Sequence, residues 1–143
     1  MTHILQMIFC FIATYFYAMT MNAPKNTLVY SSVIAAFGYL IYEYSTMMAQ
    51  PMLGFLLGTS LVAALGEILA RKLKVPATIF IFPGVIPIVP GFGLYETILA
   101  FVQDDVYLAL EKGATTILSI ACMAIAMALV SIMFLKIKIK KAN

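Results

Sequence analysis

Long apolar stretches alternate with short polar breaks along the chain, and this pattern predicts five membrane-spanning helices. The hydrocarbon core of a bilayer requires roughly 20 consecutive apolar residues in helical conformation. Five stretches come close to or exceed that length, and they cover residues 4–21, 28–46, 51–70, 77–103 and 114–135. We therefore predict an all-α integral membrane protein, with residues 1–143 forming a single transmembrane domain of five transmembrane helices.

The fourth stretch differs from the others because a Pro/Gly-rich segment interrupts it. Three prolines and two glycines fall close together there: Pro83, Gly84, Pro87, Pro90 and Gly91. Each proline removes a backbone donor and disturbs the carbonyl four residues before it. Irregular backbone persists in hydrocarbon only where protein or water surrounds it. We therefore expect a fourth helix broken by residues 83–91 inside the membrane, with helical halves at 77–82 and 92–103.

This broken segment is the first candidate for a substrate site. The prolines would free the carbonyls of Ile79, Pro83 and Ile86, which could accept hydrogen bonds from an ammonium group or a cation. The amides of residues 91–94 would open a new half-helix, whose positive end suits a carboxylate. The candidate substrate-binding residues are Pro83, Gly84, Pro87, Pro90, Gly91, Phe92, Gly93 and Tyr95. A kinked helix whose neighbours satisfy the freed groups is the alternative interpretation.

Acidic residues within the apolar stretches leave several roles open. Glu96 follows the break and either complements the dipole of the second half-helix or acts as a proton-coupling acid. Glu43 is either a carboxylate at the headgroup level or a functional acid facing the protein interior. Glu67 lies one turn before Arg71, and this spacing predicts an ion pair within one helix.

Small residues in the apolar stretches indicate packing rather than chemistry. Gly54 and Gly58 are four residues apart, a spacing that lets membrane helices approach closely, and we predict that they pack against another helix. Cys10 and Cys122 have no other cysteine or histidine nearby at metal-ligand spacing. We therefore expect no disulfide and no metal site.

Composition supports the membrane interpretation and argues against several functions. The chain is 64% hydrophobic and 10% charged, whereas soluble domains are roughly 45–50% apolar and about 25% charged. A net charge of +3 is too small for a nucleic-acid-binding surface. No Walker-type glycine loop, histidine-containing catalytic set or cofactor motif is found, so we expect neither an enzyme nor a cofactor. The only mixed polar loop is predicted to contain Asp104, Asp105, Glu111 and Lys112.

The distribution of lysine and arginine predicts the orientation in the membrane. With five crossings, Lys25, the cations of residues 71–74 and those of residues 136–141 share one side, and Lys112 alone lies opposite. Cytoplasmic loops carry an excess of these residues, so the N-terminus is expected outside and the C-terminus in the cytoplasm. A fourth segment that dipped into the membrane and returned would divide the cations almost evenly, so we favour a crossing segment.

The proline-glycine pattern resembles that of a known transporter family. Residues 82–95 read Phe-Pro-Gly-Val-Ile-Pro-Ile-Val-Pro-Gly-Phe-Gly-Leu-Tyr. This run is similar to the Pro-Gly-x-x-Pro-x-x-Pro-Gly-x-x-x-Tyr signature in the C-terminal half of the threonine/serine exporter family. Residues 16–24 read Phe-Tyr-Ala-Met-Thr-Met-Asn-Ala-Pro and precede an apolar span with Gly38. This part resembles the first turn and second helix of the same family.

The resemblance implies a subunit of a secondary exporter for threonine, serine or a dicarboxylate such as succinate. In that family a ten-helix exporter is built from one polypeptide or from two, and this chain is similar to the small subunit of the two-chain form. The resemblance therefore implies a larger membrane subunit of the same family as partner, in the inner or cytoplasmic membrane of the cell. The residues leave open an alternative, a non-transporting scaffold that stabilises a partner.

Overall fold

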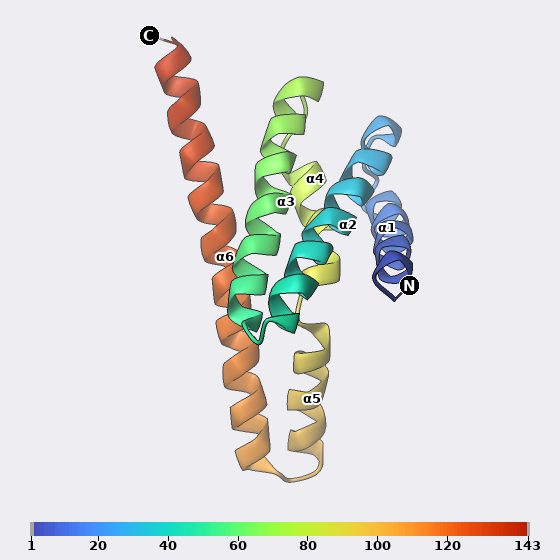
Figure 1. The fold of residues 1–143 in the computed structure, drawn as a ribbon, viewed down its shortest axis with the longest axis vertical. Helices are drawn as coiled ribbons and strands as arrows, with labels where there is room; N and C mark the ends of the chain where they lie inside the picture. Colours follow the sequence, from blue (N-terminus) through green and yellow to red (C-terminus); the bar gives the residue numbers. More distant parts are fainter. Residues whose placement is uncertain (1, 143) are drawn as a thin grey trace.

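In the computed structural model, which describes residues 2–142 and the side chains of residues 3–136, every regular element is a helix. The elements are α1 (Thr2–Thr20), α2 (Lys25–Met47), α3 (Pro51–Leu73), α4 (Thr78–Val85), the 3₁₀ turn η1 (Ile86–Ile88), α5 (Gly91–Val102) and α6 (Val106–Ala142). Helices α1 to α4 form a bundle, and α6 runs along α3 (Figure 1). The predicted all-α fold is confirmed.

Tight turns reverse the chain between consecutive helices. The backbone has a positive φ of 55–59° at four turn residues, Asn22, Ala49, Lys74 and Asp104. Pro51 begins α3 at a position where the missing amide hydrogen would have no helical partner. The reversals bring the C-terminal ends of α3 and α6 to one end of the molecule, whereas the turns after α2 and α5 lie toward the other (Figure 1).

Three helices in the described part of the chain are long and apolar enough to cross a membrane by themselves. They are His3–Thr20, Pro51–Leu73 and Val106–Lys136. Thr78–Ile88 and Gly91–Val102 add a fourth if the bent pair counts as one span. Helix α2 falls outside this set, and its polar residues, which include Lys25 and Glu43, lower its apolar character. The structure thus gives three to four candidate spans, and the predicted five are not confirmed.

The apolar core lies where α3 packs against α2, α4 and α6. Val62, Phe80 and Ile88 are at most 1% exposed there. A Cβ atom on Gly58 would lie 2.8 Å from the carbonyl oxygen of Gly38, and one on Gly54 would lie 2.8 Å from the carbonyl oxygen of Tyr42. Gly54 and Gly58, selected for their spacing, thus let the backbones of α2 and α3 approach within this chain.

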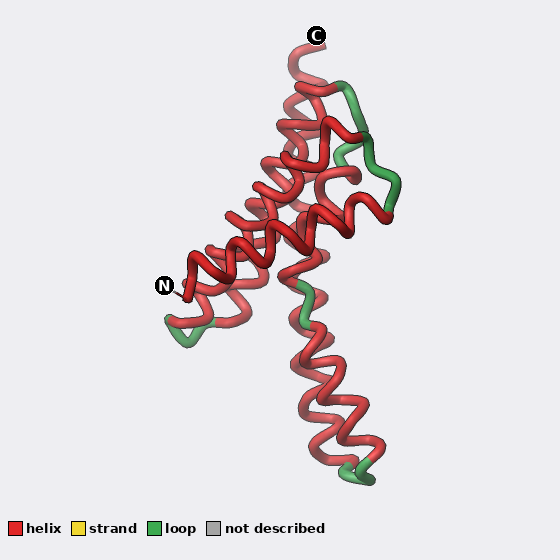
Figure 2. The backbone as a smooth tube through the Cα atoms, turned by 90° about the vertical axis from the view of Figure 1, so that its right-hand side faces the viewer, coloured by secondary structure: helices red, strands yellow, loops and turns green. Residues whose placement is uncertain are grey.

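Helix α5 and the facing half of α6 form a helical hairpin, residues 91–118, which we call the arm. The arm projects away from the bundle (Figure 2). Helix α6 has 37 residues and is therefore about 55 Å long at about 1.5 Å per residue, which exceeds the roughly 30 Å of a hydrocarbon core. Part of α6 must therefore lie beyond that core if the helix crosses upright.

The start of α6 corrects one prediction from sequence. Helix α6 begins at Val106, eight residues before the predicted fifth span. Asp105 Oδ1 accepts a hydrogen bond of 3.0 Å from the Leu108 amide, so Asp105 caps the helix. Glu111 and Lys112 therefore lie inside α6 rather than in a mixed polar loop, and the turn is limited to residues 103–105.

Candidate functional site

The break in the fourth segment is shorter than the nine residues predicted from its prolines. Helix α4 continues through Pro83 to Val85, and η1 follows directly. The non-helical residues are Val89 and Pro90, where the two halves meet at 54°. A proline loses one helical hydrogen bond, but its fixed φ is compatible with a helix. Pro83 is therefore accommodated within α4, and the predicted end of the first half at residue 82 is wrong.

The carbonyl groups near the break are largely occupied. The Ile86 amide donates to the Pro83 carbonyl. The Val89 amide donates to the Val85 carbonyl at 3.1 Å and to the Ile86 carbonyl at 3.3 Å. In these 3₁₀ turns the amide three residues later donates to carbonyl groups whose usual partner, four residues later, is a proline. The prediction that the carbonyls of Pro83 and Ile86 are free is therefore wrong.

One amide donor remains available where α5 begins. The Gly91 amide donates to the Val89 carbonyl at 2.7 Å, and the Leu94 amide donates to the Pro90 carbonyl at 3.2 Å. Within the described chain, the Gly93 amide donates to neither Pro90 nor Val89, the non-helical residues three and four positions before it. The first amides of a helix lack intrahelical partners, so this start of α5 offers the Gly93 amide as a donor to an anion.

The inner candidate residues are enclosed by the bundle. Pro83 and Gly84 are buried. A Cβ atom on Gly84 would lie 2.7 Å from Val62 Cγ1, so glycine lets α4 lie directly on α3. Pro87 and Pro90 are half-buried at the bend. These four residues lie in or beside the bend, and they present little surface to a ligand in the isolated chain.

The outer candidate residues face away from the bundle. No atom lies within 4 Å of the position that a Cβ atom on Gly91 would occupy. Phe92 is 72% exposed and Tyr95 is 58% exposed, and their ring centroids are 6.2 Å apart. The open backbone of Gly91 thus lies next to two exposed aromatic rings at the start of the arm.

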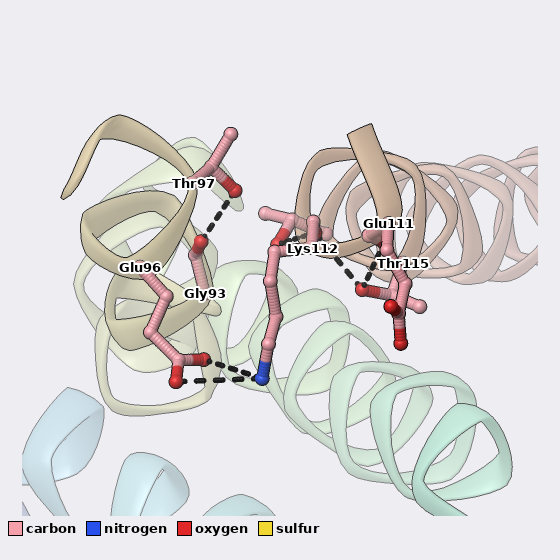
Figure 3. A network of polar contacts seen from close by, with 7 residues as sticks. Gly93, Glu96, Thr97, Glu111, Lys112 and Thr115 are labelled. Atoms are coloured by element: carbon pink, nitrogen blue, oxygen red, sulfur yellow. Dashed lines mark hydrogen bonds and ion pairs between the residues drawn. The ribbon is translucent and has the colours of Figure 1, made fainter. Parts of the chain in front are cut away.

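Glu96 and Gly93 connect α5 to α6 within the arm. Lys112 Nζ lies 3.2 Å from Glu96 Oε2 and 3.4 Å from Glu96 Oε1 (Figure 3). A Cβ atom on Gly93 would lie 2.5 Å from Thr116 Oγ1, so the two helices approach closely. The Gly93 carbonyl accepts a 2.7 Å hydrogen bond from Thr97 Oγ1. Helix α5 has no acidic residue in its first turn, so Glu96 pairs with a lysine and does not cap the helix start.

A second polar pair joins α1 to α2. His3 Nδ1 lies 3.3 Å from Glu43 Oε2, and the Glu43 side chain is 17% exposed. Both residues line a cavity of about 600 Å³ at the end of α2. The sequence left the role of Glu43 open and assigned none to His3. The helical spacing of His3, Gln6 and Cys10 along one face of α1 was the available signal.

The predicted pair of Glu67 and Arg71 is present in α3. Arg71 Nη2 lies 3.8 Å from Glu67 Oε2. The same nitrogen donates to the Phe134 carbonyl at 2.7 Å, and Ser131 Oγ donates to Glu67 Oε1 at 3.4 Å. The pair therefore also ties α3 to α6, which is a structural role.

Comparison with known proteins gives the family. A family model described as "Threonine/Serine exporter, ThrE" matches residues 6–133. No curated protein and no solved structure matches the chain. The matched residues run from α1 into α6 and include the whole break. The resemblance noted in the sequence is therefore confirmed, and the chain belongs to the threonine/serine exporter family, a family of transporters.

Proposed function

We propose that this chain is a subunit of a secondary exporter of small polar metabolites, either threonine and serine or a dicarboxylate such as succinate. The observation that carries the proposal is the start of α5, where the Gly93 amide lacks an acceptor within the described chain and Gly91 leaves the backbone open. Family membership supports the transport class. We place the protein in the inner or cytoplasmic membrane.

A carboxylate is the group common to all three proposed substrates. Amides at this helix start, Gly93 among them, would donate to it, and the positive end of the α5 dipole would stabilise its charge. Gly91 would allow the ligand to reach these amides because no side chain stands in the way. Pro83, Gly84, Pro87 and Pro90 would hold this start in position, and Tyr95 would cover the bound ligand.

The proposed site needs a second surface. Phe92 and Tyr95 are mostly exposed, and a transporter site usually lies between two structural repeats. We propose that a larger membrane subunit of the same family supplies the missing surface. The scaffold alternative uses the same exposed residues for contact with a partner but binds no substrate.

The two functions differ in their response to a side chain at residue 91. Vesicles containing the chain with its partner are loaded with radiolabelled threonine, serine or succinate, and efflux is measured. Gly91→Leu should abolish efflux while the protein remains in the membrane, because the side chain fills the approach to the amides. Gly91→Ala is the matched control and should retain efflux. Normal efflux with Gly91→Leu would show that the substrate does not bind at this position, and it would favour the scaffold function.

Glu96 is the proposed coupling acid of this site. If Glu96 carries protons, export by Glu96→Gln should lose its dependence on pH. If the carboxylate only holds Lys112, the variant should keep the pH profile of the wild type and lose part of its stability. The two results separate coupling from arm structure.

A further inference from the structure

The interface between α1 and α2 contains a line of polar side chains that the proposed substrate site does not use. His3, Gln6, Cys10 and Thr14 recur every three or four residues and therefore lie on one face of α1. Helix α1 packs mainly on α2, with smaller contacts to α4 and η1. The other faces of α1 expose apolar side chains, among them Phe9, Ile12 and Phe16. The polar residues thus follow the contact with α2.

Two atoms in this line are buried without a hydrogen-bond partner in the described chain. They are Oε1 of Gln6 and Oγ1 of Thr14, and Thr14 is 0% exposed. A membrane offers no water to such groups from the lipid side, and leaving them unsatisfied is costly. Such groups are satisfied by side chains across a helix interface or by buried water molecules.

At its His3 end, this line of polar residues meets the carboxylate of Glu43 on α2. The carboxylate of Glu43 lies beside His3 and close enough to Cys10 and Tyr39 to act on both electrostatically. Among the described residues, the titratable groups around Glu43 are His3 and Cys10 from α1, and Tyr39, Tyr42 and Tyr44 from α2. Leu53 and Leu57 of α3 and Gln50 in the turn before it also line the adjoining cavity, and none of them titrates. His3 is 47% exposed, so the pair lies at an open end of the α1–α2 interface.

The other end of the line lies deeper, beside α4. His3 pairs with Glu43, and Met7 and Phe11 share the wall of one hollow with Val33 and Ala36. This antiparallel register brings Thr14 level with Ser31 and Ser32, which are buried on α2. Both serines donate to the Leu28 carbonyl, and their oxygen atoms can still accept a hydrogen bond.

The same part of α2 contacts the broken segment. A Cβ atom on Gly84 would lie 3.8 Å from Ile34, and one on Gly38 would lie 3.4 Å from Ile88. Helix α2 thus contacts both the polar line and the segment that carries the break. Each of the two unpartnered atoms in the line can accept a hydrogen bond from a water molecule.

We propose that the α1–α2 interface is a hydrated proton path that starts at His3 and Glu43 and passes Gln6 and Cys10 to reach Thr14. This inference rests on the proposed function, because a secondary exporter must couple export to an ion gradient. In the proposed orientation, the Glu43 end faces the outside, from which protons would enter as the substrate leaves. The ligand class is water, with the proton passing between hydrogen-bonded groups.

Thiol labelling tests the water in this path without requiring transport. The full chain is embedded in membranes as the Cys122→Ser variant, so that Cys10 is its single cysteine. A cationic methanethiosulfonate reagent, which requires an aqueous route, should label Cys10. The matched control is Phe9→Cys in a background without Cys10 and Cys122, because residue 9 lies on α1 but faces outward. This control should show no labelling by the cationic reagent.

Glu43→Gln in the Cys122→Ser background should slow the cationic reagent more than a neutral maleimide, because the carboxylate attracts cations. A lack of cationic labelling at Cys10 would show that the interface is dry and would overturn the proposal. Equal labelling at residues 9 and 10 would also overturn it, because access would then not be specific to the interface.

Transport assays separate this proposal from the substrate site. Glu43→Gln should flatten the pH dependence of efflux, and Thr14→Val, which removes one hydroxyl group at constant shape, should slow proton-driven efflux. Thr20→Val on the same helix is the control and should behave as wild type. Gly91→Leu should stop efflux yet leave Cys10 labelling unchanged. Unaltered pH dependence in Glu43→Gln would exclude Glu43 as the entry group even if the substrate site is correct.

Discussion

Glycine residues in this chain have different roles that depend on what lies beside their Cα atoms. Gly58 faces the backbone of α2, and a Cβ atom there would lie 2.8 Å from the Gly38 carbonyl oxygen. Gly91 faces open space. The sequence suggested packing for Gly58 from its spacing with Gly54. It could not separate packing from ligand access, because both require a small residue.

Gly58→Ala should therefore destabilise the protein by about 1–3 kcal/mol, the usual cost of overpacking a core. Backbone atoms cannot move aside as a flexible side chain can. The measurement is thermal unfolding in detergent, followed by circular dichroism. Gly91→Ala is the matched control, and a similar loss in both variants would contradict the packing argument.

At the scale of elements, the arm is the part of the fold that sequence predicted least well. Helix α6 begins eight residues before the predicted span. Asp105 caps this early start, and Lys112 in the first turns forms an ion pair with Glu96 on α5. The break was predicted in the correct segment, but with too many residues. Local rules treat each proline as a helix breaker, whereas packing on α3 keeps the helix intact through Pro83.

The ion pair between Glu96 and Lys112 should be measurable as a coupling between α5 and α6. Glu96→Lys and Lys112→Glu should each destabilise the arm, and the exchanged double variant should recover stability. The Glu96 and Lys112 side chains are 32% and 37% exposed. We therefore expect a small coupling energy of about 0.2–1 kcal/mol, the range for exposed pairs. A double-mutant cycle on thermal unfolding measures it, and strictly additive effects would show that the pair contributes nothing.

The bend between α4 and α5 should depend on the prolines beside it. Pro87→Ala combined with Pro90→Ala restores two backbone donors and should straighten the 54° bend. Spin labels on cysteines at residues 78 and 102 should then move apart in pulsed electron paramagnetic resonance. Pro83→Ala is the control, because α4 is already helical at that position. An unchanged distance in the double variant would mean that packing, not proline, sets the bend.

At the scale of the whole molecule, the order of helices fits the orientation that charge predicted. The turn after α3 and the end of α6 lie at one end of the molecule (Figure 1), and both carry lysine residues. Five crossings place the N-terminus outside and the C-terminus in the cytoplasm. This remains a prediction, because α2 does not qualify as a span by composition and the bent pair can also form a re-entrant loop.

Reporter fusions test this topology directly. A reporter that folds only in the cytoplasm should be active when fused after Lys141 and inactive when inserted after Gln103 in the turn between α5 and α6. A reporter active only outside the cytoplasm should give the opposite result. Activity of the outside reporter after Lys141 would reject the predicted orientation. Cytoplasmic activity at both positions would indicate a re-entrant segment.

The sequence by itself determined the helical membrane class, the transporter family and the location of the break, because hydrophobic length, proline and glycine act locally. The pair of Glu67 and Arg71 was also predictable, since four residues are one helical turn. Only the tertiary structure joined His3 to Glu43 and Glu96 to Lys112. These contacts join different helices, and they depend on the register in which the helices pack. For α5 and α6 one such packing contact is at Gly93, where a Cβ atom would lie 2.5 Å from Thr116 Oγ1, and no single stretch of sequence encodes it.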